Sequence, residues 1–423
     1  MTRVTDVFED LAWRGLIAHS TDANALRAHL DAGPVTFYVG FDPTAPSIHM
    51  GNLVQIMVAR ALQRAGHRPI LLVGGSTGLI GDPKQAGERS MNPADVVAEW
   101  VARIREQVSR LISFDGANPA TLVNNYDWTA SLSTLDFLRD VGKHFPVNRM
   151  LDREVVRARL EAGISYSEFS YVLLQSLDYR ELFRRHGCTL QTGGSDQWGN
   201  LTAGVELIRR SEGARVHALA TPLITKADGT KFGKTESGTV WLDPAMTSPY
   251  AFHQFFLNAE DAKVLDYLKV FSERPRGELE EIAARSVEEP HLRVAQRALA
   301  DDVTDLVHSP AERESAAAAA QAIFGRGELG ALPADTLRAV AEELGATTIG
   351  ASDGRPTVVD ALEASGVVSS KSAARRAITE GGAYVNNVKV TDPTARLDAA
   401  DVLPGGLVVL RRGRRTVGAI KLG

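Results

Sequence analysis

Cysteine is almost absent from this chain of 423 residues, which contains only Cys188. A single cysteine excludes an internal disulfide framework and a zinc site built from cysteines, and it favours a reducing compartment. Long apolar runs are also missing, since none approaches the ~18 residues of a membrane-spanning helix. The N-terminus, MTRVTDVFEDLAWRG, has acidic residues early and lacks the apolar core of a signal peptide. We therefore expect a cytoplasmic protein without a membrane partner.

Negative charge is scarce near the C-terminus. From Gly366 to Gly423 there are ten Lys and Arg but only four Asp and Glu, a net charge of +6, whereas the whole chain carries −5. The remainder is therefore at −11. A basic segment on an acidic body favours a polyanionic partner such as nucleic acid, although a solvated basic surface is the simpler explanation of the charge alone.

The N-terminal part has the pattern of an α/β nucleotide-binding fold. TFYVGF (36–41) predicts a strand, LVQIMVARALQRAG (53–66) a helix, and the apolar run RPILLVGG (68–75) a strand buried on both faces. In such a βαβ unit ligands bind outside the carboxyl ends of the strands. The polar stretch FDPTAPSIHMGN (41–52) lies at one of these ends and at the start of a helix, where free N–H groups and the helix dipole favour phosphate.

The composition divides the chain into further segments. Residues 1–242 form the α/β body, and 243–325 have helical periods throughout. Glycine and proline are frequent over 326–356, which predicts a linker, and a last small domain occupies 357–423.

Two glycine motifs do not indicate a nucleotide site. GRGELG (325–330) fits G-x-G-x-x-G but follows an alanine-rich helix rather than a strand, so it is not a dinucleotide-binding turn. GGSTGLIGDPK (74–84) lacks the G-K-[ST] ending of a P-loop.

Two other patterns point to chemistry. ITKADGTKFGKTESG (224–238) places Lys231 and Lys234 in a loop with glycines, which suits closure over a triphosphate as well as it suits a solvated basic loop. In EFSYVLLQSLDYRELF (168–183), Tyr171, Gln175 and Asp178 share one stripe of a helix that is otherwise mostly apolar. A polar stripe on a buried helix predicts an internal cavity, and the alternative is a solvent-facing edge.

Six motifs in order give the chain a family resemblance. FDPTAPSIHMGN resembles the HIGH signature of class I aminoacyl-tRNA synthetases, and KFGKT resembles their KMSKS loop. Together with GGSTGLIGDP, NNYDW, SYSEFSYVLLQSLDY and GGSDQWGN, they resemble bacterial tyrosyl-tRNA synthetases over essentially the whole chain. SSKSAARRAITEGGAYVNNVKV (369–390) is similar to the S4 RNA-binding module at the end of these enzymes.

The resemblance implies a Rossmann-like parallel-sheet catalytic domain, an all-α anticodon-binding-type domain and a small α+β S4-like domain. It implies formation of tyrosyl-adenylate from L-tyrosine and ATP, with Mg²⁺ accompanying ATP and no structural metal, and then transfer to the terminal adenosine of tRNA(Tyr). It also implies a homodimer, through the segment near 140–166. The catalytic residues implied are Thr44, His49, Asn52, Lys231, Lys234 and Thr235. The implied tyrosine-binding residues are Tyr38, Asp82, Asn125, Tyr171, Gln175, Asp178, Gln191 and Gln197. The implied ATP-binding residues are Gly40, Asp42, His49, Gly51, Asn52, Gly194, Asp196 and Lys234. The implied RNA-binding residues are Lys371, Arg375 and Arg376.

The chain departs from the family pattern at two places. The signature ends in Asn52 where the motif has a second histidine, so this position donates a hydrogen bond without carrying charge. The loop after Asp82 has fewer lysines than relatives usually have, and neither Lys84 nor Arg89 receives a role. A tryptophanyl enzyme and an RNA-binding homologue without catalysis are the alternatives. The pairing of Tyr38 with Asp178 suits a phenol better than an indole and argues against the first. The intact KFGKT, Asp82 and the stripe of Tyr171, Gln175 and Asp178 argue against the second.

Overall fold

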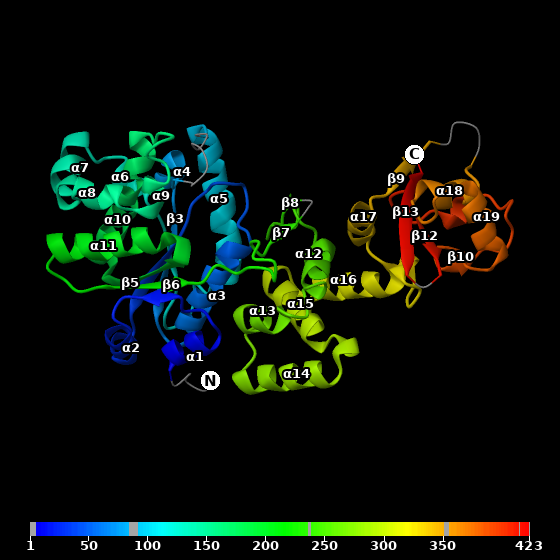
Figure 1. Cartoon of the computed structure of the whole chain (residues 1–423), viewed down its shortest axis with the longest axis horizontal. Helices are drawn as coiled ribbons and strands as arrows, with labels where there is room; N and C mark the ends of the chain where they lie inside the picture. Colours follow the sequence, from blue (N-terminus) through cyan, green and yellow to red (C-terminus); the bar gives the residue numbers. More distant parts are fainter. Residues whose placement is uncertain (1–5, 84–91, 236–237, 351–354, 414, 423) are drawn as a thin grey trace. The chain divides into compact units, whose positions relative to one another are not determined.

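The structure is a computed structural model that describes residues 6–83, 92–235, 238–350, 355–413 and 415–422. Lys84 and Arg89 lie outside these ranges. The chain separates into two compact units (Figure 1). The first contains residues 1–243 and 260–279, and the second contains 244–259 and 280–423. None of the described helices is both long and apolar enough to span a lipid bilayer.

A six-stranded sheet organises the first unit, in the order β1-β6-β5-β2-β3-β4. The strands are β1 (His19–Ser20), β2 (Thr36–Phe41), β3 (Arg68–Val73), β4 (Thr121–Asn124), β5 (Cys188–Gly194) and β6 (His217–Thr221). All neighbours are parallel except β1 and β6. The chain builds outward from β2 to β4 on one side and from β5 to β6 on the other. The strand order therefore reverses between β2 and β5, which is where open α/β sheets bind ligands.

Helices cover both faces of this sheet, with α10 and α11 on one side and α3 and α5 on the other (Figure 1). Their bounds are α3 Met50–Arg64, α5 Ala94–Leu111, α10 Tyr166–His186 and α11 Trp198–Ser211. The smaller helices of this unit are α1 Val7–Trp13, α2 Ala23–Asp31, α4 Thr77–Ile80, α6 Tyr126–Thr129, α7 Thr134–Asp140, α8 Val147–Leu151, α9 Glu154–Arg157 and α13 Val264–Phe271. The α/β class and the βαβ unit predicted from the sequence are confirmed.

One core cluster explains how α10 is fixed on the sheet. Tyr38, Ile70 and Leu72 from β2 and β3 pack with Leu173 and Leu177 of α10. Residues at even positions of a strand face the same side, so the apolar runs of β2 and β3 present one set to α10. The helix begins at the N-cap Ser165, whose side chain accepts from the Glu168 N–H, and ends at Gly187 with a left-handed φ of 62°.

The second unit combines helices with a C-terminal sheet. Its helices are α12 Pro249–Leu257, α15 Val294–Val307, α16 Pro310–Ile323, α17 Ala334–Glu343, α18 Val358–Ala364 and α19 Lys371–Thr379, and α14 Arg276–Glu288 belongs mostly to it. The sheet has the order β11-β10-β12-β13-β9. Its strands are β9 Thr347–Ile349, β10 Ala383–Val385, β11 Val388–Lys389, β12 Leu407–Arg412 and β13 Thr416–Leu422.

The segment 326–356, which the sequence predicts as a linker, contains regular structure. It includes α17, and β9 pairs in parallel with β13. Leu337 and Val340 of α17 pack in one cluster with Leu407 and Val409 of β12. Breaker residues at 325–333 end α16, but the apolar spacing of α17 allows it to pack on the sheet.

Candidate active site

A cavity of about 600 Å³ opens at the carboxyl ends of β2 and β5. The ends of both strands line it, together with the start of α3, the polar stripe of α10 and the segment 221–241. It therefore lies at the switch point of the sheet and wholly within the first unit.

The start of α3 is held by a reciprocal cap. His49 is the N-cap, and its Nδ1 accepts from the Gly51 N–H at 3.1 Å, while Asn52 Oδ1 accepts from the His49 N–H at 3.0 Å. Burial, and then the charge of Lys234, lowers the pKa of His49. The imidazole is therefore neutral at pH 7, and because Nδ1 is an acceptor, Nε2 carries the proton. Asn52 keeps its amide N–H groups as donors at the cavity.

Gly51 leaves no room for a side chain at this helix start. A Cβ there would lie 3.0 Å from Cε1 of His49, so even alanine would press on the imidazole. A flat ligand can approach the backbone where the side chain is missing.

The lysine loop packs directly on the start of α3. Gly233 has a φ of 90°, and a Cβ on it would lie 2.6 Å from Cγ of Met50. The Val240 N–H donates to the Gly233 carbonyl at 2.9 Å, and Lys234 Nζ donates to Thr239 Oγ1 at 2.6 Å. The strand β7 (Lys234–Thr235) thus pairs with β8 (Gly238–Thr239), and Lys234 and Thr239 lie at the mouth of the cavity. Both Lys231 and Lys234 lower the pKa of His49, so two cations face the helix start.

Hydrogen bonds to Asp42, the residue after β2, join it to Thr77 of α4 and to Tyr171 of α10. Thr77 Oγ1 donates to Asp42 Oδ1 at 2.6 Å, and the Tyr171 hydroxyl donates to Asp42 Oδ2. A Cβ at Gly74 would lie 2.2 Å from both Asp42 Oδ1 and Thr77 Oγ1, so only glycine permits this approach. Asp42 thus lies with the residues expected to bind tyrosine.

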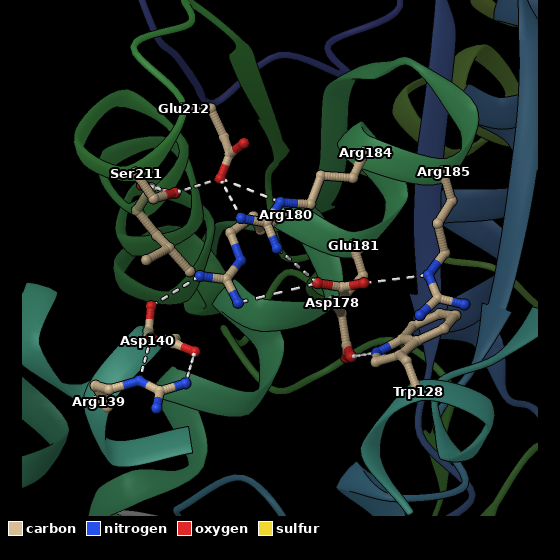
Figure 2. A network of polar contacts seen from close by, with 11 residues as sticks. Trp128, Arg139, Asp140, Asp178, Arg180, Glu181, Arg184, Arg185, Ser211 and Glu212 are labelled. Carbon is tan, nitrogen blue, oxygen red and sulfur yellow. Dashed lines mark hydrogen bonds and ion pairs between the residues drawn. The ribbon is translucent and has the colours of Figure 1, made fainter. Parts of the chain in front are cut away.

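A buried carboxylate lies at the inner end of the polar stripe. Asp178 Oδ1 accepts from the Trp128 indole N–H at 2.9 Å (Figure 2), and Oδ2 accepts from Asn125 Nδ2 at 2.9 Å. Burial raises the pKa of Asp178 to about 7, against the effect of these two donors. The carboxylate is therefore held in place by groups that favour its charged form, in a site that penalises the charge.

The Tyr38 hydroxyl, near this carboxylate, is buried and has no hydrogen-bond partner among the described residues. Gln55 Oε1 and Gln191 Oε1 are also buried without a partner among those residues, and all three residues line the cavity. Burial raises the pKa of Tyr38 well above its usual value, so its hydroxyl remains protonated. Buried polar groups are nearly always hydrogen-bonded, so the Tyr38 hydroxyl indicates a polar partner in the inner cavity.

Asp82 is bound by two amides. Gln197 Nε2 donates to Oδ2 at 2.8 Å, and Asn200 Nδ2 donates to Oδ1 at 3.2 Å. The 3-10 helix Ser195–Gln197, which supplies Gln197, also places Asp196, whose Oδ1 would lie 2.5 Å from a Cβ at Gly194.

Most of the side chains implied by the resemblance line this one cavity. Asn125 and Thr235 do not line it. Asn125 Nδ2 donates to Asp178 Oδ2, and Thr235 Oγ1 donates to the Gly238 carbonyl at 3.2 Å. Lys371, Arg375 and Arg376 lie exposed on α19 of the second unit. The sequence reasoning assigned no role to Trp128, Thr77 or Asn200, although each lies inside or beside a quoted motif. The residues implied by the resemblance that line the cavity are Tyr38, Gly40, Asp42, Thr44, His49, Gly51, Asn52, Asp82, Tyr171, Gln175, Asp178, Gln191, Gly194, Asp196, Gln197, Lys231 and Lys234.

Comparison with known proteins agrees with this geometry. The family model of class I tRNA synthetases (W and Y) matches residues 30–325, and the model of the SYY-like tyrosine–tRNA ligase C-terminal domain matches 339–418. The tyrosine–tRNA ligase of Cutibacterium acnes is 63% identical over 417 residues, which cover 99% of this chain and 100% of the relative. The chain belongs to the tyrosine–tRNA ligase family.

Other relatives support the same family. The tyrosine–tRNA ligase of Kineococcus radiotolerans is 59% identical, over 99% of both chains. A C-terminally truncated mitochondrial tyrosyl-tRNA synthetase of Aspergillus nidulans has a TM-score of 0.66 and 31% identity, covering 74% of this chain and 93% of its own. Similarity over almost the full length of the relatives extends the family assignment from the catalytic unit to the C-terminal sheet.

Proposed function

We propose that this chain is a tyrosine–tRNA ligase that forms tyrosyl-adenylate and then transfers the tyrosyl group to the 3′-terminal adenosine of tRNA(Tyr). The observation that carries this proposal is a cavity with an orphaned phenol and a buried carboxylate at its inner end and two lysines at its mouth. Pyrophosphate exchange into ATP that depends on tyrosine, and not on tryptophan, tests it. Exchange driven by tryptophan would favour the tryptophanyl alternative, and no exchange would favour a non-catalytic homologue.

In the activation step a tyrosine carboxylate oxygen attacks the α-phosphorus of ATP, and the bond to pyrophosphate breaks. The carboxylate is already ionised, so the site needs no general base and supplies alignment and charge stabilisation. His49 donates from Nε2 to the phosphates, and Asn52 donates from its amide. Lys231 and Lys234 neutralise the charge that develops on the departing pyrophosphate. Thr44 is proposed as a second phosphate donor and Thr235 as support for the loop.

The two ends of the tyrosine substrate meet different groups. The phenol hydroxyl donates to Asp178 and accepts from Tyr38, and the ammonium group binds among Tyr171, Gln175 and Asp82. Phenylalanine would leave the buried carboxylate and hydroxyl without partners, which is costly in a dry pocket. Gln191 and Gln197 are proposed as supporting contacts, and Asn125 orients Asp178.

The nucleotide lies along the start of α3, with adenosine against Gly51. Asp196 is proposed as a ribose partner with Gly194, and Gly40 and Asp42 as further contacts. Mg²⁺ is expected to arrive bound to the phosphates of ATP. The phosphate end of the cavity fits this arrangement, because His49, Lys231 and Lys234 offer donors there and the ATP phosphates supply the oxygen ligands that Mg²⁺ prefers.

A homodimer is proposed through the segment near 140–166. Val147, Leu160 and Tyr166 in this segment are 61%, 50% and 68% exposed. Large apolar side chains gathered on one segment favour burial against another protein surface. The protein is proposed to act in the cytoplasm.

Asn52 gives a prediction at the position where the chain departs from the family motif. Asn52→His should be nearly silent above pH 7, because one imidazole nitrogen can accept from the His49 N–H while the other donates to ATP. Asn52→Ala should lose the donor, at a cost of roughly 0.5–1.5 kcal/mol in transition-state stabilisation. Single-turnover adenylation from pH 5.5 to 8.5 checks this. A gain in the histidine variant alone as pH falls through ~6.5 would show that positive charge, not a neutral donor, is what the position supplies.

The α19 cations give a prediction for tRNA. Lys371→Gln, Arg375→Gln and Arg376→Gln combined should leave tyrosine activation unchanged and weaken tRNA binding. Each lost phosphate contact should flatten the dependence of log K on log salt by roughly 0.7–0.9. Lys371 also pairs with Asp360 at 2.8 Å, so unfolding temperature is measured alongside. Unchanged tRNA affinity and salt dependence would remove α19 from the RNA interface. Substitution is preferable to truncation after Pro356, because β9 and α17 pack against β12 and β13.

A further inference from the structure

A buried amide lies between the carboxylate of the tyrosine site and a residue that the proposed reaction does not use. Asn200, in the first turn of α11, is 2% exposed. Its Nδ2 donates to Asp82 Oδ1 at 3.2 Å and to Gln197 Oε1 at 2.8 Å. Its Oδ1 accepts a hydrogen bond from Nη2 of Arg153. Arg153 therefore reaches the tyrosine site through one intervening side chain.

Local structure does not explain why a guanidinium is placed here. Arg153 is the N-cap of α9, but its side chain makes no capping hydrogen bond. It lies instead against the first turn of α11, where a Cβ at Gly199 would be 3.3 Å from Nη2. The positive end of a helix dipole disfavours a cation. Burial also lowers the pKa of Arg153, and the charge of Asp82 acts against this effect.

We infer that Arg153 is a positioning residue for the ammonium group of tyrosine, an inference that rests on the proposed role of Asp82. The two ends of an asparagine amide have almost the same shape but opposite hydrogen-bonding character. A guanidinium has only donors, so Arg153 holds Asn200 Oδ1 toward itself. The amide nitrogen of Asn200 is thereby turned toward Asp82 and Gln197.

The orientation passes on to the carboxylate. Because Gln197 uses Oε1 to accept from Asn200, its Nε2 donates to Asp82 Oδ2 at 2.8 Å. Both oxygens of Asp82 therefore accept from amides whose orientation depends on Arg153. If Asn200 turned over, its oxygen would face the carboxylate and displace it. Arg153 thus controls how the ammonium group is bound and takes no part in the transfer of the adenylyl group.

Arg153→Met should raise the KM for tyrosine in adenylate formation about tenfold, since a charge-assisted hydrogen bond is lost, and should change kcat less than twofold. Binding of 3-(4-hydroxyphenyl)propionate, which has the phenol and carboxylate of tyrosine but no ammonium, should be unchanged. Arg153→Lys should recover part of the tyrosine affinity. Arg209→Met is the matched control, because Arg209 is exposed on α11, the helix that carries Asn200, and lies outside the proposed dimer segment.

Each outcome decides the inference. An unchanged KM for tyrosine in Arg153→Met would overturn it, and so would an equal loss of affinity for tyrosine and its deaminated analogue, which would indicate a general loss of pocket structure. Asp82→Asn separates this inference from the proposed function. If Asp82→Asn leaves tyrosine affinity unchanged, the ammonium site itself is misassigned. If Asp82→Asn weakens tyrosine binding and Arg153→Met does not, only the role of Arg153 fails.

Discussion

Lys234→Ala should slow adenylate formation by roughly 3–4 kcal/mol, or about two to three orders of magnitude, with little change in tyrosine affinity. Lys234 Nζ lies at the cavity mouth, and among the described residues it donates to the neutral Thr239 Oγ1 in a solvent-exposed hydrogen bond. It is therefore available to pyrophosphate at little cost. Charge on pyrophosphate develops as its bond to the α-phosphorus breaks, so the contact is stronger in the transition state than in the ground state.

Stopped-flow adenylation at saturating tyrosine measures this effect, and equilibrium binding measures tyrosine affinity. Lys226→Ala is the control, because Lys226 belongs to the same loop but does not line the cavity. Wild-type adenylation in Lys234→Ala would remove this lysine from the mechanism. A matching loss in Lys226→Ala would mean that the loop responds to total charge and not to one placed cation.

Asp178→Ala should lower kcat/KM for tyrosine by roughly 1.5–3 kcal/mol, because the phenol loses a charged acceptor, and should reduce the preference over phenylalanine. It should also destabilise the fold by roughly 1–3 kcal/mol for each donor left unpaired, Trp128 and Asn125.

Tyr38→Phe tests the same phenol contact without the loss of stability. The Tyr38 hydroxyl has no partner among the described residues, so its removal should cost no stability and only roughly 0.5–1.5 kcal/mol of selectivity.

The pH dependence of this selectivity has a definite sign. The pKa of Asp178 in the free protein is raised to about 7 by burial, so the carboxylate is ionised above pH 7 and protonated below it. The preference of wild-type kcat/KM for tyrosine over phenylalanine should fall as pH decreases through about 7, since kcat/KM reports the free enzyme. Asp178→Ala should lack this transition. Selectivity that both variants retain, at every pH, would contradict the assignment of these residues to the phenol.

The raised pKa also affects stability. A folded pKa above the unfolded value of about 3.8 means that the contribution of Asp178 to stability is greatest below pH 3.8 and decreases as pH rises to about 7. The pocket therefore keeps an ionised carboxylate at some cost to the fold, which is typical of groups retained for function.

The sequence was sufficient to predict the fold class and the parts of the cavity that depend on local pattern. Apolar runs identified β2 and β3, and helical spacing put Tyr171, Gln175 and Asp178 on one stripe. The spacing of residues along one element is fixed by its geometry, so it survives folding unchanged. The family resemblance supplied the roles, which spacing alone left open.

Contacts between distant segments were beyond the sequence. Nothing in the pattern around Trp128 indicates that its indole N–H donates to Asp178, and nothing around Arg153 indicates that it reaches Asn200. Such contacts depend on how α6, α9 and α11 pack in three dimensions. The breaker-rich segment 326–356 illustrates the same limit, because the pairing of β9 depends on β13, a strand some 70 residues later.

The most direct test of the central claim is a crystal structure of this protein with a non-hydrolysable analogue of tyrosyl-adenylate. The account predicts the phenol oxygen within hydrogen-bond distance of Asp178 and Tyr38, the ammonium group among Tyr171, Gln175 and Asp82, and the adenosine against Gly51. A phenol ring directed away from Asp178, or an adenosine bound away from the start of α3, would contradict it.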